Sequence, residues 1–248
     1  MILTLTTDFS DSGGFAARLK ALILKLFKDD VTIIDVTHNI SPFNAVEAAY
    51  IVRTALLDFE KGSIHIVVVD PGVGSKRDIV AVKFQSSYII APDNESLSLI
   101  EPEVVVKIDK KKINPASFKT FEGYGIMVPA AYKLYKQGIE SLGKPCKLSS
   151  PKLFPVKRKS IIKGKIVYID RFGNCITNIE ERLFAKQFKL IKIKSFTFNK
   201  LNKTYSDKTS GALAVINSAG FLEFSFYKKS FRSKAGVNYL DDVEIVLG

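Results

Sequence analysis

Apolar runs and stretches of helical periodicity alternate through the first half of the chain, and this order limits its fold more than any other feature. Residues 2–7, 31–36 and 63–70 read as strands, because they are short apolar runs bounded by polar or turn-forming residues. Residues 15–27 carry apolar side chains at helical spacing, and residues 44–59 are rich in strong helix formers. Apolar strands separated by helices predict a mostly parallel sheet with helices on both faces.

The α/β pattern continues to about residue 150. Two adjoining runs, 78–84 and 87–92, read as strands joined by a short turn. Residues 126–137 have the periodicity of one more helix. We therefore predict an N-terminal α/β domain over residues 1–150.

The character of the sequence changes beyond that point. Residues 148–164 contain prolines, serines and a run of cations, which suits a linker. Short strands at close spacing follow, so we predict a C-terminal all-β domain over residues 151–248, built as a barrel or a sandwich. The strands expected there are 165–170, 175–180, 190–196, 212–217, 221–226 and 243–247.

The balance of charge is basic but the cations are dispersed. The 248 residues include 37 lysines and arginines against 25 acids, a net charge of +12. The runs at 110–112 and 157–159 are short, and no helix carries a continuous basic face. We expect a solvated lysine-rich surface and no nucleic-acid partner; nucleic-acid binding is the weaker alternative.

The sequence also limits the compartment and the metal chemistry. No apolar run reaches the roughly 18–20 residues of a membrane span, and the first residues lack a signal-peptide pattern. Cys146 and Cys175 have no CxxC spacing, which predicts a cytoplasmic protein without a disulfide framework and without a thiolate metal site. The lack of a long apolar run predicts no membrane partner. His38 and His65 are the only histidines, and His65 falls in a strand expected to be buried, so we predict no metal site.

Acidic residues end two of the predicted strands. Asp8 follows the first strand and Asp70 ends the third, and ligands bind at the carboxyl ends of strands in open α/β sheets. The sequence PGVGSKR after Asp70 is neither GxGxxG nor GxxxxGK[ST], so it predicts a tight turn and not a nucleotide triphosphate loop. Arg77 can return across this turn toward Asp70. Caps for Asp8 and Asp70 and a structural ion pair for Arg77 are the alternatives.

A third polar cluster lies in the second half, within IDRFGNCITN at residues 169–178. An acid, an aromatic side chain, a glycine and two amides stand close together there. A binding turn and an ordinary polar hairpin turn both fit this composition.

Several of these segments together resemble one family. The chain contains, in order, LTTDF, DVTHNISPF, VVVDPGVGSKR, APDN, TFEGYGIMVPAA, YIDRFGNCITNI and INSAGFLE. They are similar to motifs of the S-adenosylmethionine (SAM) hydroxide adenosyltransferases, the family that also contains the fluorinase and chlorinase. The resemblance extends over nearly the whole chain.

The resemblance implies an N-terminal α/β domain and a C-terminal β-barrel. It implies a homotrimer with SAM bound between the N-terminal domain of one subunit and the C-terminal domain of the next. The implied reaction is attack of water or hydroxide on the ribose C5′, which gives adenosine and methionine. No metal and no other cofactor is implied. Halide chemistry is disfavoured, because the halide enzymes replace the acid that Asp70 retains.

The family's site residues are carried over by position. Asp8 resembles the acid that holds the ribose hydroxyls, and Phe43 resembles an aromatic side chain that packs on the nucleoside. Ser218 resembles a serine at the methionine carboxylate. The residues that resemble groups around the methionine amine are Asp170, Phe172 and Asn174. Asp70 and Arg77 match two members of a hydroxide-forming set of aspartate, arginine and histidine.

The third member of that set differs. Glu122 in FEGYG stands where the family has the histidine of FHGRD, with Tyr124 and Gly125 at the next two differing positions. Ser10, Gly13 and Glu95 also depart from the pattern. An ionised Glu122 competes with Asp70 for Arg77, whereas a protonated one could act as an acid or base. Glu122 is therefore either a substituted catalytic group or a sign of lost activity, and a catalytically impaired SAM- or adenosine-binding protein is the alternative function.

Overall fold

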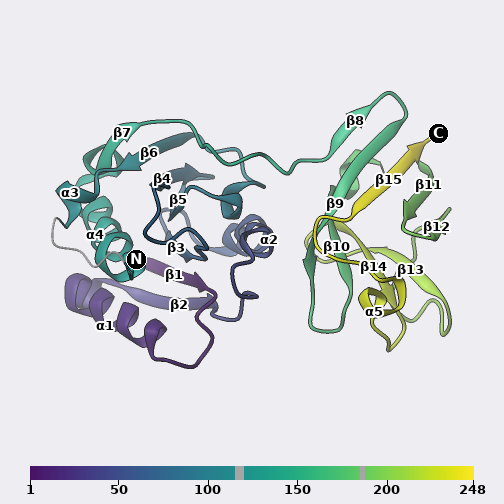
Figure 1. Cartoon of the computed structure of the whole chain (residues 1–248), viewed down its shortest axis with the longest axis horizontal. Coiled ribbons are helices and arrows are strands. Elements are labelled where there is room, and N and C mark those ends of the chain that lie inside the picture. The colour runs from purple at the N-terminus through teal and green to yellow at the C-terminus, as the bar shows by residue number, and fades with distance from the viewer. Residues whose placement is uncertain (115–119, 185–187) are drawn as a thin grey trace. The chain divides into compact units, whose positions relative to one another are not determined.

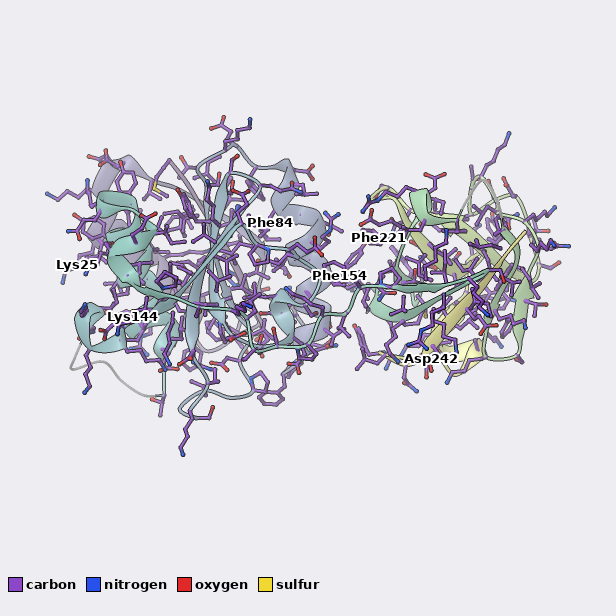
Figure 2. The ribbon with its side chains drawn as sticks, turned by 90° about the horizontal axis from the view of Figure 1, so that it is seen from above. Lys25, Phe84, Lys144, Phe154, Phe221 and Asp242 are labelled. Atoms are coloured by element: carbon purple, nitrogen blue, oxygen red, sulfur yellow. The ribbon has the colours of Figure 1, made fainter. Side chains whose placement is uncertain are left out.

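The chain forms two compact units in a computed structural model that describes residues 1–114, 120–184 and 188–248. The first unit is Met1–Lys152 and the second is Leu153–Gly248 (Figure 1). Side chains crowd the interior of each unit, and the segment that carries Phe154 connects them (Figure 2). Among the described helices, none has the length and apolar character needed to cross a membrane.

A seven-stranded sheet forms the middle of the first unit, in the order β2-β1-β3-β5-β4-β6-β7. The pairs β2-β1, β1-β3 and β3-β5 are parallel, as predicted, and the sheet continues antiparallel through β4, β6 and β7. Its strands are β1 Ile2–Thr7, β2 Thr32–Thr37, β3 Ile64–Val68, β4 Ile79–Phe84, β5 Ser87–Pro92, β6 Val104–Ile108 and β7 Gly143–Pro145. Our sequence interpretation missed β6 and β7.

Helices cover both faces of this sheet, which confirms the predicted fold class. They are α1 Phe15–Phe27, α2 Ala45–Ala55, α3 Lys110–Ile113 and α4 Val128–Gln137. The buried side chains of α1 and α4 share one apolar core with the sheet, and those of α2 share another. Figure 1 shows α1 and α4 on one side of the strands and α2 on the other.

The alternation of side chains along β3 supplies both cores. Ile64, Ile66 and Val68 pack with α1 and α4, and Val67 and Val69 pack with α2. Every one of them is at most 6% exposed. A strand that buries both faces reads as a continuous apolar run, which explains the sequence IHIVVV.

The register of β1 and β3 places the two predicted acids on one edge. Thr7 lies opposite Val68 in this parallel pair, so Asp8 and Asp70 both follow the carboxyl ends of adjacent strands. This is the edge at which open α/β sheets bind ligands.

His65 lies in β3 as a core residue, and its burial lowers its pKa from 6.5 to about 4. Its Nδ1 shares a 2.8 Å hydrogen bond with the Thr4 hydroxyl. The unfolded chain binds a proton at His65 below about pH 6.5, whereas the folded chain does so only near pH 4. The contribution of neutral His65 to the unfolding free energy is therefore fully present above about pH 6.5 and is lost as the pH falls toward 4. We expect this single group to remove roughly 3 kcal/mol of unfolding free energy over that range.

Chemical denaturation at pH 7, 5.5 and 4 measures this effect. His65→Gln, which keeps a polar partner for Thr4 but does not titrate, should flatten the decline in unfolding free energy toward pH 4. Parallel pH curves for the variant and the wild type would show that other groups cause the acid sensitivity.

The second unit is an eight-stranded antiparallel sheet in the order β12-β11-β15-β9-β10-β14-β13, with β8 paired to β9. A bridge between Asn202 and Val215 connects the chain after β12 to β13, so the sheet is nearly closed on itself. The strands are β8 Val156–Arg158, β9 Ile161–Ile169, β10 Cys175–Glu180, β11 Phe188–Ile193, β12 Phe196–Phe198, β13 Ala212–Ile216, β14 Phe221–Phe226 and β15 Asp242–Leu247. The predicted all-β, barrel-like character is confirmed.

Part of the expected linker is a hairpin instead. β8 and the first residues of β9 lie within the segment 148–164 and pair with one another. β8 has the sequence VKR, with one apolar residue in three, so it is too short to show the alternation from which a strand could be predicted, and all three residues are exposed. The short helix α5, Phe231–Ala235, also follows β14.

Candidate active site

Arg77 folds back onto Asp70 across the turn that follows β3. Its Nε donates a 2.8 Å hydrogen bond to Asp70 Oδ1, and its Nη2 donates to Asp70 Oδ2. Gly72 N also donates to Asp70 Oδ1 at 3.1 Å. A Cβ at Gly72 would lie 3.3 Å from Arg77 Cγ, so the glycine gives the arginine room to return. The contact predicted from the sequence is therefore present, as a two-pronged arginine–carboxylate pair.

Glu122 joins this pair from a distant part of the chain. Arg77 Nη2 donates to Glu122 Oε2 as well as to Asp70. Glu122 directly precedes a π-helical turn, Gly123–Met127, which continues into α4. A Cβ at Gly123 would lie 3.1 Å from Val68 Cγ1, so the glycine allows this turn to lie close against β3. Three of the predicted residues, Asp70, Arg77 and Glu122, thus form one contiguous cluster.

The cluster has a fourth member that our sequence interpretation missed. Lys110, the first residue of α3, donates a 2.6 Å hydrogen bond from Nζ to Glu122 Oε1. We took the lysine run at 110–112 for solvated surface, and Lys111 and Lys112 are indeed exposed. The signal that could have indicated a role for Lys110 was Glu122, because a carboxylate that is buried needs a cationic or hydrogen-bonding partner.

The interior of the cluster is largely hidden from solvent. The side chains of Asp70, Arg77 and Glu122 are 6%, 12% and 8% exposed, whereas that of Lys110 is 34% exposed. Burial alone would lower the pKa of Arg77, but the hydrogen bonds and charge of Asp70 and the charge of Glu122 outweigh it and raise that pKa. Arg77 Nη1 is buried and has no hydrogen-bond partner among the residues that the structure describes. The hydrogen-bonding capacity of this nitrogen is therefore unused within the described residues.

Asp8 and Phe43 form a second contact at the same edge of the sheet. The backbone N of Phe43 donates a 3.1 Å hydrogen bond to Asp8 Oδ2. Phe43 has a left-handed backbone with φ of 65° and a side chain that is 70% exposed. An aromatic ring presented to solvent by a strained backbone is typical of a binding position.

Ser10, one of the residues that depart from the family pattern, has a backbone conformation that favours glycine. Its φ of 55° is in the left-handed region, which glycine adopts without steric cost, and its N donates a 2.7 Å hydrogen bond to His38 O. The chain after Asp8 thus has a left-handed residue at a position where the family pattern has glycine.

In the second unit, Asp170 organises the turn between β9 and β10. Its Oδ1 accepts 2.9 Å hydrogen bonds from the N of Phe172 and of Asn174, and its Oδ2 accepts from Asn174 Nδ2 at 2.8 Å. A Cβ at Gly173 would lie 2.0 Å from Ser230 Oγ, and Gly173 O accepts from Arg232 N at 2.9 Å. This glycine therefore brings the turn against the start of α5.

A pocket opens beside this turn, with a cavity volume of about 490 Å³. It has a carboxylate, an amide and an exposed aromatic ring from the turn, and two lysines from the segment after β14. Its lining residues are Asp170, Phe172, Asn174, Tyr205, Ser225, Phe226, Lys228, Lys229 and Ser230. Our sequence interpretation found Asp170, Phe172 and Asn174 but not Lys228 or Lys229, which resemble ordinary surface lysines.

Ser218 lies elsewhere in this unit. It is exposed in the turn between β13 and β14, whose Gly220 O accepts a 2.9 Å hydrogen bond from Glu181 N. That turn is at the opposite end of β10 from Asp170, and Ser218 does not line the pocket. The assignment of Ser218 to the methionine carboxylate stays a prediction.

The chemistry of these groups is polar and acid–base in character. Among the described residues, no group of three or more histidine, cysteine, aspartate or glutamate side chains is arranged to hold a metal ion. The first unit has hydrogen-bond acceptors, a buried arginine with an unpaired donor and an exposed aromatic ring, and the second unit has a pocket with a carboxylate, an amide and two lysines. Each set of groups suits a polar ligand that forms hydrogen bonds.

The chain resembles known proteins over almost its full length. The N-terminal domain of the SAM hydroxide adenosyltransferases matches residues 3–143, and their C-terminal domain matches residues 164–244. The (R)-S-adenosyl-L-methionine hydrolase of Methanocaldococcus jannaschii is 33% identical, over 99% of this chain and 95% of that protein. A fluorinase of Actinopolyspora mzabensis is 22% identical over 90% of each chain. Among solved structures, an uncharacterized conserved protein from Thermotoga maritima matches with a TM-score of 0.85 and 29% identity, over 99% of this chain and 100% of that one.

The fold, the order of the motifs and these matches agree. This chain belongs to the SAM hydroxide adenosyltransferase family, as the sequence motifs predicted.

Proposed function

We propose that this protein hydrolyses S-adenosyl-L-methionine to adenosine and L-methionine. The observation that carries the proposal is the buried contact between Asp70 and Arg77 at the ligand edge of the sheet, with Arg77 Nη1 left as a free donor. The family membership and the names of the M. jannaschii and Thermus thermophilus relatives, both SAM hydrolases, support the same reaction.

The reaction balances without any cofactor. The oxygen of water forms a bond to the ribose C5′ and loses one proton to solvent. The C5′–S bond breaks, its electron pair stays on sulfur, and the sulfonium becomes the neutral thioether of methionine. Since the nucleophile becomes anionic and the leaving group starts cationic, charge is neutralised in the transition state, and a site with little water favours this step.

Asp70 and Arg77 have complementary roles in this proposal. Asp70 fixes the plane of the guanidinium through Arg77 Nε and Nη2, so that Nη1 is aimed at the attacking oxygen. The positive charge of Arg77 favours hydroxide over water at that position. Asp8 would accept hydrogen bonds from the ribose hydroxyls, and Phe43 would stack on the nucleoside, a contact worth about 1–3 kcal/mol.

The pocket of the second unit suits the amino-acid end of the substrate. Asp170 and Asn174 would hold the methionine amine, and the ammonium groups of Lys228 and Lys229 are matched to a carboxylate. The groups assigned to the nucleoside and to methionine belong to different units. We therefore keep the homotrimer, with substrate bound between subunits, as part of the proposal, together with a cytoplasmic location that the free thiols of Cys146 and Cys175 favour.

Incubation with SAM tests the proposal. Chromatography should show adenosine and methionine appearing in equal amounts, above the rate of spontaneous breakdown. A protein that binds SAM in calorimetry and forms no product would instead be the impaired SAM- or adenosine-binding protein, the alternative that Glu122 in the histidine position favours. If the protein binds neither SAM nor adenosine and forms no product, both functions are excluded.

Phe172→Ala is expected to weaken substrate binding without affecting the fold. The side chain is 77% exposed, so its loss should leave the melting temperature unchanged within about 1 °C. We expect the KM for SAM to rise about tenfold if the ring covers the bound methionine, with kcat less affected. Val156→Ala is the control, because Val156 is another exposed apolar side chain of the second unit, 52% exposed, that does not line the pocket; it should keep the wild-type KM. Equal KM values for wild type and Phe172→Ala would remove Phe172 from the binding site.

A further inference from the structure

Lys110 adds a positive charge to the cluster of Asp70, Arg77 and Glu122. Its Nζ lies 2.6 Å from Glu122 Oε1, whereas Arg77 donates to the other oxygen, Oε2. The two oxygens of Glu122 thus have separate cationic partners. Glu122 is 8% exposed and Lys110 34% exposed, so the ion pair reaches from the interior of the cluster to solvent.

The fold holds Lys110 in this position. The preceding residue, Asp109, caps α3 by accepting hydrogen bonds from the N of Lys111 at 3.2 Å and of Lys112 at 3.4 Å. Asp109 N donates to Leu142 O at 2.9 Å, which fixes the start of the helix beside β7. Lys110 is therefore the residue of this lysine run that is directed to the cluster.

The sum of charges shows what Lys110 contributes. Asp70 and Arg77 cancel, and an ionised Glu122 alone would leave the cluster with one net negative charge. Lys110 returns the sum to zero. The family resemblance places a histidine where Glu122 stands, and a histidine in its neutral form would also give a sum of zero with Asp70 and Arg77.

We propose that Lys110 is a positioning residue that neutralises Glu122, so that the Glu122–Lys110 ion pair takes the electrostatic place of a neutral side chain beside Arg77. The charge of Arg77 is then available to the attacking oxygen. This inference rests on the proposed hydrolase function. In this interpretation Glu122 does not impair the reaction, because Lys110 compensates its charge.

A charge-matched pair of variants separates this role from simple anchoring. Lys110→Met leaves Glu122 uncompensated, and kcat for SAM hydrolysis should fall at least tenfold with KM changed less than about twofold. Adding Glu122→Gln to Lys110→Met restores a net charge of zero, although it removes the ion pair, and should recover most of the lost kcat. Lys110→Arg should keep kcat within about threefold of wild type.

Lys111→Met is the matched control, because it removes the same charge from an exposed position of the same helix and should leave kcat unchanged. Thermal melting of each variant reports whether it is folded, and Lys110→Gln replaces Lys110→Met if the latter does not fold. A double variant as slow as Lys110→Met, or a Lys110→Met enzyme with wild-type kcat, would overturn the inference while the hydrolase function stands. A wild-type protein without turnover would overturn the hydrolase function and the inference with it.

Discussion

Asp70→Asn is expected to lower kcat for SAM hydrolysis by at least a hundredfold, comparable to losing one preorganised electrostatic group in other enzymes, about 10²–10³-fold. The amide keeps the size of the side chain but loses the negative charge that fixes the guanidinium of Arg77. The NH2 group of the asparagine would also face an N–H group of Arg77, so that two hydrogen-bond donors would meet without an acceptor. The orientation of Arg77 Nη1, and with it the position of the attacking oxygen, should be lost.

Steady-state kinetics with adenosine as the measured product test this expectation. Asp242→Asn is the control, because Asp242 also pairs with a cation, Lys165 at 2.8 Å, but its side chain is 84% exposed in the second unit. The control should keep wild-type kcat. An Asp70→Asn enzyme with kcat within threefold of wild type would mean that Asp70 has no part in the reaction.

Arg77→Met is expected to have the other large effect, on both activity and stability. It removes the only cation in contact with Asp70 among the described residues and leaves a buried carboxylate without its partner, a change that costs about 3–5 kcal/mol in comparable ion pairs. We expect kcat to fall at least a hundredfold and the unfolding free energy to fall by a few kcal/mol.

Arg77→Lys separates the charge from the shape of the side chain. An ammonium keeps the positive charge, so stability should be largely retained. It cannot donate from two fixed nitrogens to Asp70 while presenting a third to the ligand, so kcat should still fall about tenfold or more. Denaturant unfolding and kinetics on both variants check these results, with Arg182→Met as the control, since Arg182 is 75% exposed. Wild-type kcat in Arg77→Lys would show that the fork geometry is irrelevant to the reaction.

Much of the first unit was predictable from local sequence. The bounds of β1 and α1 coincide with the apolar run at residues 2–7 and the helical stripe at residues 15–27. Each segment has one clear periodicity, and the fold uses it unchanged. The return of Arg77 to Asp70 followed from the glycine-containing turn between them.

Other features depend on contacts between distant residues and left no local trace. β8 is three exposed residues, Val156–Arg158, too short to show a strand periodicity, and it is a strand through its pairing with β9. Lys110 resembles its exposed neighbours in the sequence, and its role depends on the distant Glu122. Lys228 and Lys229 line a pocket because α5 begins beside the Asp170 turn, a packing that the strand pattern does not contain.

Hydrolysis in ¹⁸O-labelled water tests the central claim most directly, because it reports which bond is broken and what attacks it. Mass spectrometry of the products should show one ¹⁸O atom in adenosine, at the 5′ oxygen, and unlabelled methionine, and Asp70→Asn should form neither above background. Unlabelled adenosine, or products in which a bond other than C5′–S has been cleaved, would contradict attack of water on C5′ at the site formed by Asp70 and Arg77.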